Sequence, residues 1–273
     1  MIQRTSHLTS YDLLKALALI LMITDHVGHH FYPDEMWFRV LGRLCVPIWF
    51  FLIGYARTDA VSPKILLGGA IVTLSALVAG QYVFPLDILF TIALIRKTRH
   101  GCAIRATQSP QNLRGWFLLL LFAAVPTGLL FEYGTLGIMF VLQGFIARNR
   151  AVLKERLKPW HTKLFAYSSV CFFGILQGVF MPSLTLAQVG VLFVGLFAIS
   201  ALLERFKAAD YPALTRVLTR PGAFLIHIMG RRTLEIYVLH ILIFRGVCMT
   251  LYPETYAFWG WRWMPPGLLS WLS

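Results

Sequence analysis

Residues 13–32 of this chain read LLKALALILMITDHVGHHFY, an apolar stretch with a lysine near one end and an Asp-His pair in its second half. Lipid offers backbone amides no hydrogen-bonding partner, so apolar stretches of this length form helices. A full crossing of the bilayer needs roughly 20 residues. We therefore predict a membrane-spanning first helix, which is retained rather than cleaved as a signal peptide because no small-x-small cleavage site follows Asp25 and His26.

Eight more apolar runs follow along the chain. They occupy residues 40–56, 65–84, 86–95, 115–131, 135–147, 164–181, 186–203 and 233–252. The runs 86–95 and 135–147 are too short for a straight crossing, so we predict tilted, broken or re-entrant segments there. The tail contains Trp259, Trp261, Trp263, Pro265, Pro266 and Trp271 and is predicted to be an interfacial segment or a short tenth helix. The expected fold is all-α: a polytopic transmembrane helix bundle of about nine or ten segments, forming a single domain over residues 1–273.

Composition supports a membrane protein. Of the 273 residues, 58% are hydrophobic and 14% are charged, against about 25% charged in soluble domains. The net charge of +13 would suggest nucleic-acid binding in a soluble protein, but 21 of the 25 Lys and Arg residues fall at every second boundary between apolar runs. Positive-inside logic then places the N-terminus and the basic loops in the cytoplasm, with the lipid bilayer rather than nucleic acid as partner.

Ionisable residues within the apolar runs are the candidates for a functional site, because each costs at least about 2.5 kcal/mol to insert. They are Lys15, Asp25, His26, Arg43, His240 and Arg245. Lys15 and His26 are eleven residues apart and project from one face of a helix. Arg43 is expected at the depth of Asp25, so it either forms an ion pair with Asp25 or has a functional role. Adjacent helical residues do not face each other, so no Asp25–His26 dyad is assumed.

Histidines leave further alternatives open. His26 is either a hydrogen-bonded core histidine, a reactive group, or a metal ligand together with His30 at i+4; no third ligand at helical spacing is evident, so no metal is expected. The four cysteines are scattered and suggest neither a disulfide framework nor a zinc cluster. Tyr237 and His240 share one helix face at i and i+3, which fits an interhelical hydrogen bond.

Four motifs carry a family resemblance. The stretches 14–26 (LKALALILMITDH), 41–48 (LGRLCVPI), 87–90 (DILF) and 236–240 (IYVLH) resemble the TraX family of integral membrane acetyltransferases. The type member of that family is implicated in acetylating the N-terminal residue of a conjugative pilin. The spacing of a basic residue and a histidine is also similar to that of the wider transmembrane acyltransferase group, which transfers acyl groups from cytoplasmic acyl-CoA to acceptors that are often glycans.

The resemblance implies an acyl-CoA-dependent acetyltransferase of the bacterial inner membrane, whose acceptor is a pilin N-terminus or an envelope glycan. His26 would act as a general base or as an acetyl carrier. Asp25, next to His26 in the sequence, would be a second catalytic residue, and Arg43 would be the third and would stabilise the oxyanion. The acetyl-CoA-binding residues would be Lys15, Tyr237, His240 and Arg96, with Arg96 otherwise serving only as a topology signal.

Two other classes of function stay open at this point. A proton-coupled transporter would use His26 and His240 as relay groups, although no convincing internal repeat is present. A non-catalytic assembly factor for a pilus or envelope complex would need no reactive group.

Overall fold

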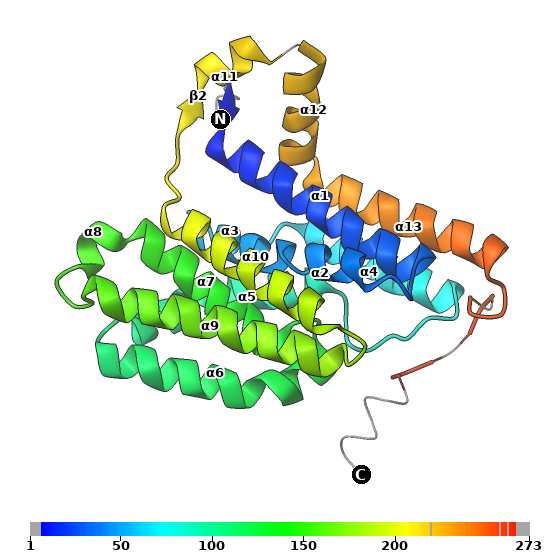
Figure 1. Cartoon of the computed structure of the whole chain (residues 1–273), viewed down its shortest axis with the longest axis horizontal. Helices are drawn as coiled ribbons and strands as arrows, with labels where there is room; N and C mark the ends of the chain where they lie inside the picture. Colours follow the sequence, from blue (N-terminus) through cyan, green and yellow to red (C-terminus); the bar gives the residue numbers. More distant parts are fainter. Residues whose placement is uncertain (1–6, 219, 257, 261, 266–273) are drawn as a thin grey trace.

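A computed structural model describes residues 7–218, 220–256, 258–260 and 262–265. Its helices are α1 (Ser10–Phe31), α2 (Met36–Gly42), α3 (Cys45–Tyr55), α4 (Pro63–Val78), α5 (Ile88–Ala106), α6 (Pro110–Leu130), α7 (Gly134–Arg148), α8 (Arg150–Leu153), α9 (Pro159–Phe180), α10 (Leu186–Glu204), α11 (Pro212–Val217), α12 (Arg220–Arg231) and α13 (Thr233–Leu251). Two short strands, β1 (Leu8–Thr9) and β2 (Asp210–Tyr211), pair antiparallel and join the start of the chain to the segment after α10 (Figure 1). The fold is a polytopic helical bundle, as predicted.

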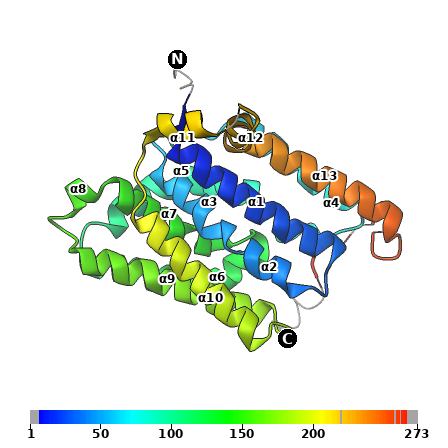
Figure 2. The same cartoon turned by 45° about the horizontal axis from the view of Figure 1, so that its top comes forward.

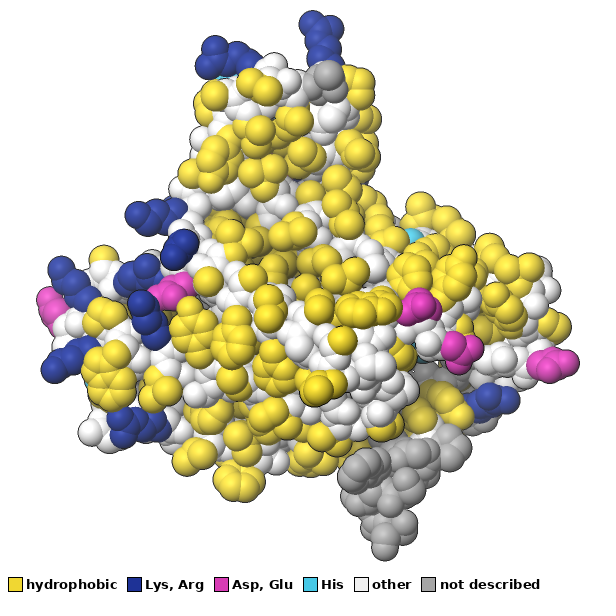
Figure 3. All heavy atoms as spheres, in the orientation of Figure 1, with side chains coloured by type: hydrophobic (Ala, Val, Ile, Leu, Met, Phe, Trp, Pro, Cys, Tyr) yellow, Lys and Arg dark blue, Asp and Glu magenta, His cyan; other side chains and the backbone are white. Residues whose placement is uncertain are grey.

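Membrane-spanning capacity is concentrated in five helical segments of the described chain. They are Met36–Tyr55, Pro110–Leu130, Pro159–Phe180, Leu186–Glu204 and Thr233–Leu251, and each is long and apolar enough to cross a bilayer. Pro63–Val78 and Gly134–Arg148 are shorter apolar helices. Figure 3 shows hydrophobic side chains over the middle of the surface, with Lys and Arg gathered at the left and top and Asp and Glu mainly at the right. The protein is therefore a membrane protein with one basic end.

The run 40–56 is not one continuous helix. It divides into α2 and α3 at Arg43 and Leu44, where the amides of Leu44 and Val46 bond to carbonyls three residues back. Pro47 lies in the first turn of α3, where its missing N–H removes no helical bond. This break places Arg39 and Arg43 beside α1.

The run 86–95 requires a correction, because it is not a short helix. It forms the first half of the 19-residue α5, which continues through the basic residues to Ala106. Asp87 caps this helix by accepting a hydrogen bond from the Leu89 amide at 2.9 Å, and the Arg, Lys and Ala residues that follow are good helix formers. The other short run corresponds to α7, with 15 residues.

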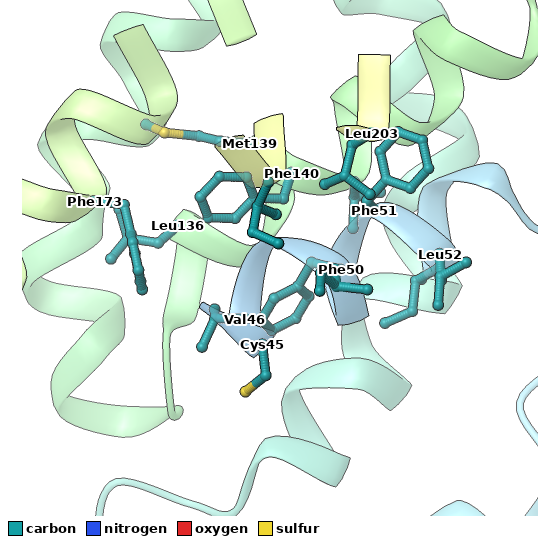
Figure 4. Packing of buried hydrophobic residues seen from close by; sticks show 14 of the residues in the cluster. Cys45, Val46, Phe50, Phe51, Leu52, Leu136, Met139, Phe140, Phe173 and Leu203 are labelled. Carbon is teal, nitrogen blue, oxygen red and sulfur yellow. The ribbon is translucent and has the colours of Figure 1, made fainter. Parts of the chain in front are cut away.

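The centre of the bundle is the contact between α3 and α7 (Figure 4). A Cβ atom added at Gly54 would lie 1.9 Å from the Val141 carbonyl oxygen, and one at Gly144 would lie 2.0 Å from that of Phe51. The two backbones therefore touch, which only glycine allows at these positions. Phe50, Phe51 and Phe140 fill the space around this contact.

Helices α1 and α13 run side by side along one face of the bundle, with α2 and α4 next to them (Figure 2). The segment between α10 and α13, predicted to be a basic loop, contains α11 and α12; α12 packs against α1, and α11 packs against β1. The tail residues 258–260 and 262–265 form no helix and lie beside the segment after α4, where Val83 and Phe84 donate to the carbonyls of Arg262 and Trp263. Trp261, Pro266 and Trp271 lie outside the described residues.

Candidate functional site

Two histidines from opposite ends of the sequence meet between α1 and α13. Nδ1 of His26 lies 2.7 Å from Nε2 of His240, and Nδ1 of His240 lies 2.8 Å from the carbonyl oxygen of Ile236. The ring planes of the two histidines are inclined by 24°. His240 is buried and His26 is partly exposed. The structure thus brings together two residues that the sequence could only suggest separately.

Tyr237 lies beside this pair and is tied to a carboxylate. Its ring centroid is 6.1 Å from that of His26, and its hydroxyl donates to Oδ2 of Asp87 at 2.5 Å. Asp87 also caps α5, so one carboxylate links the N-terminus of α5 to α13. Glu132 reaches the same helix end by accepting a hydrogen bond from the Ile88 amide at 3.2 Å.

Asp25 faces away from the histidine pair and toward α2. Its Oδ2 atom lies 2.7 Å from Nη1 of Arg39 and 3.8 Å from Nη1 of Arg43. The Arg43 guanidinium donates instead to the hydroxyl of Tyr133. The predicted Asp25–Arg43 pair is therefore the longer of two contacts, and no Asp25–His26 hydrogen bond is formed among the described residues.

Sequence reasoning missed Arg39 and Tyr133. Arg39 precedes Arg43 by four residues, so the two share one face of α2, and that spacing was the available signal. Tyr133 has a φ of 64° at the N-cap of α7, a conformation that is uncommon in non-glycine residues. Nothing in the local sequence indicates its contact with Arg43, because the two residues lie 90 positions apart.

Close packing holds Asp25 against the Gly-Arg motif. A Cβ atom added at Gly42 would lie 2.2 Å from Cβ and 2.5 Å from Cα of Asp25. Any larger residue would push α2 away from α1. The glycine of this motif therefore sets the distance at which the arginines of α2 reach the carboxylate.

A cavity of about 390 Å³ lies next to residues that neighbour the histidine pair. Its walls come from α1, α3, α4, α5 and the α12–α13 corner. Lys15, Arg96 and Arg231 are among its lining residues, as are Met22 and Tyr237. Met22 precedes His26 by one helical turn, and the Tyr237 ring is next to His26. The cavity therefore contains cations on its wall and extends to the neighbours of His26, although His26 itself does not line it.

Two residues of the cavity wall, Arg96 and Trp49, have a buried N–H group without a described hydrogen-bond partner. Nη1 of Arg96 donates to the Ala60 carbonyl at 3.0 Å, while its buried Nε has no partner among the described residues. Trp49, which sequence reasoning did not single out, also lines the cavity, and its indole N–H is buried without a described partner. Arg99 serves the fold instead, since it is buried and donates to the carbonyls of Ile53 and Ala56 at the end of α3.

The remaining candidates lie away from the cavity. His30 bonds to the Tyr256 hydroxyl at 2.8 Å, and His29 is exposed. Arg245 turns toward α4, where it donates to Ser75 and to the Val72 carbonyl at 2.5 Å each. Within the described ranges, no group of three or more His, Cys, Asp or Glu side chains is placed to hold a metal ion.

Comparison of the sequence with known proteins identifies the family of this chain. Residues 10–248 match the family model described as TraX protein. An uncharacterized protein of Rickettsia prowazekii (strain Madrid E) is 30% identical over 142 residues, which are 52% of this chain and 57% of the relative. No solved structure matches the chain. The matched residues include the α1, α2 and α13 positions described above, and the chain belongs to the TraX family.

Proposed function

We propose that this protein is a membrane acetyltransferase that takes the acetyl group from cytoplasmic acetyl-CoA and transfers it to an amine or hydroxyl acceptor. The observation that carries the proposal is that one cavity is lined both by the cations Lys15, Arg96 and Arg231 and by Tyr237. The Tyr237 ring is a neighbour of the His26–His240 pair. Acetyl-CoA has charged phosphates at one end and a thioester at the other. The phosphates need cations, and the thioester needs to lie near a reactive group, so a cavity that offers both suits this donor.

The cavity has the volume of a small-molecule site and cations on its wall. Its volume of about 390 Å³ falls in the range of about 300–1,000 Å³ found for small-molecule sites. Lys15 and Arg96 offer charge-assisted hydrogen bonds to phosphate groups. The apolar side chains of Met22, Leu52 and Ile92 line the same cavity and would contact the pantetheine arm. On this proposal the basic end of the bundle faces the cytoplasm of a bacterial inner membrane, where acetyl-CoA is available.

His26 supplies the reactive nitrogen. As a base, it accepts the proton of the acceptor N–H or O–H while the acceptor bonds to the thioester carbon, the C–S bond breaks, and the proton then passes to the thiolate to give free CoA. As a carrier, it bonds to the acetyl carbon itself and later releases the acetyl group to the acceptor. Arg43, with its Nε unpartnered among described atoms, would donate to the oxyanion.

Purified protein in lipid nanodiscs, given radiolabelled acetyl-CoA and candidate acceptors, tests the proposal. Acetyl transfer and CoA release are expected from the wild type and are expected to be lost in His26→Ala. His29→Ala is the matched control, because His29 is an exposed histidine on the same helix. Transfer by wild type that is unchanged in His26→Ala would contradict the assignment of His26.

The acceptor is proposed to be a pilin N-terminus or an envelope glycan. Mass spectrometry of pilins and of envelope glycans, from cells with and without the active protein, would show which class gains acetyl groups. Cells carrying His26→Ala should match cells that lack the protein. Identical acetylation in all strains would contradict both acceptor classes.

A further inference from the structure

The hydrogen bonds of His240 determine where its proton lies. Its Nδ1 is 2.8 Å from the Ile236 carbonyl oxygen, and a carbonyl oxygen can only accept. Nδ1 of His240 therefore carries a proton. A neutral imidazole has only one ring proton, so Nε2 of a neutral His240 is an acceptor.

A neutral His240 is the state that the surroundings favour. The side chain is 8% exposed, and no Asp or Glu within the described ranges forms an ion pair with it. A buried charge without a partner of opposite sign carries a large free-energy cost. Because Nε2 of His240 is an acceptor, the atom that contacts it must donate a proton. That atom is Nδ1 of His26, at 2.7 Å.

We infer that His240 is a positioning residue that holds His26 as the Nδ1–H tautomer, so that Nε2 of His26 is the reacting atom; this inference rests on the proposed acetyl transfer. Across the described chain, no hydrogen bond occupies Nε2 of His26. The neighbouring Tyr237 hydroxyl does not compete for that nitrogen, because it donates to Asp87. The lone pair of Nε2 is thus left available.

The assignment serves both routes of the reaction. In the base route, Nε2 takes the acceptor proton while Nδ1–H stays bonded to His240. In the carrier route, Nε2 bonds to the acetyl carbon as the C–S bond breaks, which gives a thiolate and an acetyl-imidazolium whose Nδ1–H is still bonded to His240. Loss of the Nδ1 proton to the thiolate leaves a neutral acetyl-imidazole and free CoA, so protons balance in both routes.

Nitrogen-15 NMR of histidine-labelled wild-type protein in lipid measures the tautomer directly. The resonances of His26 are assigned by their disappearance in His26→Ala. We expect a protonated Nδ1 and an unprotonated Nε2 for His26. A proton on Nε2 of His26 would overturn the inference. This measurement needs no substrate, so it is independent of whether acetyl transfer occurs.

Two substitutions of His240 separate its two hydrogen bonds. His240→Gln places an amide oxygen where Nε2 was and keeps an acceptor for His26, whereas His240→Asn keeps only the donor to Ile236. We expect kcat of His240→Gln to stay within about tenfold of wild type and kcat of His240→Asn to fall about 100-fold, with KM for acetyl-CoA unchanged in both; wrong-tautomer variants of catalytic histidines lose up to about 10⁴.

Equal losses in the two variants, or a loss confined to KM, would contradict the positioning role. Absence of CoA release by the wild type would instead contradict the proposed function and leave the NMR result to decide the tautomer. The two failures are therefore distinguishable.

Discussion

Nη1 of Arg39 lies 2.7 Å from Oδ2 of Asp25, whereas Nη1 of Arg43 lies 3.8 Å from the same oxygen. Asp25 is therefore held chiefly by Arg39, which leaves the Arg43 guanidinium to contact Tyr133. The two arginines of the α2 face therefore have different nearest partners, a carboxylate for Arg39 and a phenol hydroxyl for Arg43.

Replacing Arg39 is expected to destabilise the fold more than replacing Arg43. Arg39→Gln leaves Asp25 buried without its nearest cation, and breaking a buried pair costs about 3 kcal/mol. Unfolding in mixed micelles measures the loss. Arg232→Gln is the control, because its pair with Glu235 is exposed and such pairs contribute about 0–1 kcal/mol. An Asp25→Asn/Arg39→Gln double variant as unstable as the sum of the singles would refute the pairing.

Gly42→Ala is expected to destabilise the junction of α1 and α2. Its Cβ would lie 2.5 Å from the Cα of Asp25, and relieving such overpacking costs about 1–3 kcal/mol. Gly101→Ala is the matched control, since a Cβ there meets nothing within 4 Å and alanine favours the helix by up to about 1 kcal/mol. Thermal unfolding of both variants decides the matter, and equal stability would contradict the close packing.

Lys15→Met is expected to weaken the binding of the acetyl donor. Lys15 lines the cavity, so loss of its charge should raise KM for acetyl-CoA about tenfold, which corresponds to about 1.4 kcal/mol, with kcat little changed. Lys64→Met, at the exposed start of α4, is the control and should leave KM unchanged. A lower kcat at constant KM would place Lys15 in the chemistry instead.

Stability is expected to fall as pH rises toward neutrality because of Glu132, in the connection between α6 and α7. Burial, with repulsion from Asp87, raises the pKa of Glu132 from 4.5 to about 7. Between these values the unfolded chain binds fewer protons than the folded protein, so folding stability decreases with pH and the loss is complete above pH 7. Melting temperatures from pH 4.5 to 8 test this.

The Glu132→Gln variant should flatten that pH dependence, since glutamine does not titrate. Glu155→Gln, an exposed acid, should leave the dependence as in the wild type. A wild-type and a Glu132→Gln profile that run parallel would exclude Glu132 as the titrating group.

Much of the fold was predictable from composition and hydropathy alone. The apolar runs identified the main helices, because lipid leaves a backbone no alternative to internal hydrogen bonds. The end of α5 was not predictable in this way, since its second half is polar, and neither was the break between α2 and α3. Hydropathy locates neither feature, because the break falls inside an apolar run and α5 continues beyond one. The single-domain organisation stays a prediction.

For the site, the sequence by itself determined which ionisable residues lie within apolar runs and that Lys15 and His26 share one face of α1, because helical geometry is local. It did not determine partners. The contact of His26 with His240 spans 214 positions, and that of Tyr237 with Asp87 spans 150. Such pairs form only when α13 packs against α1 and the start of α5. Tertiary structure alone therefore decided which nitrogen of His26 is bonded and which is left open.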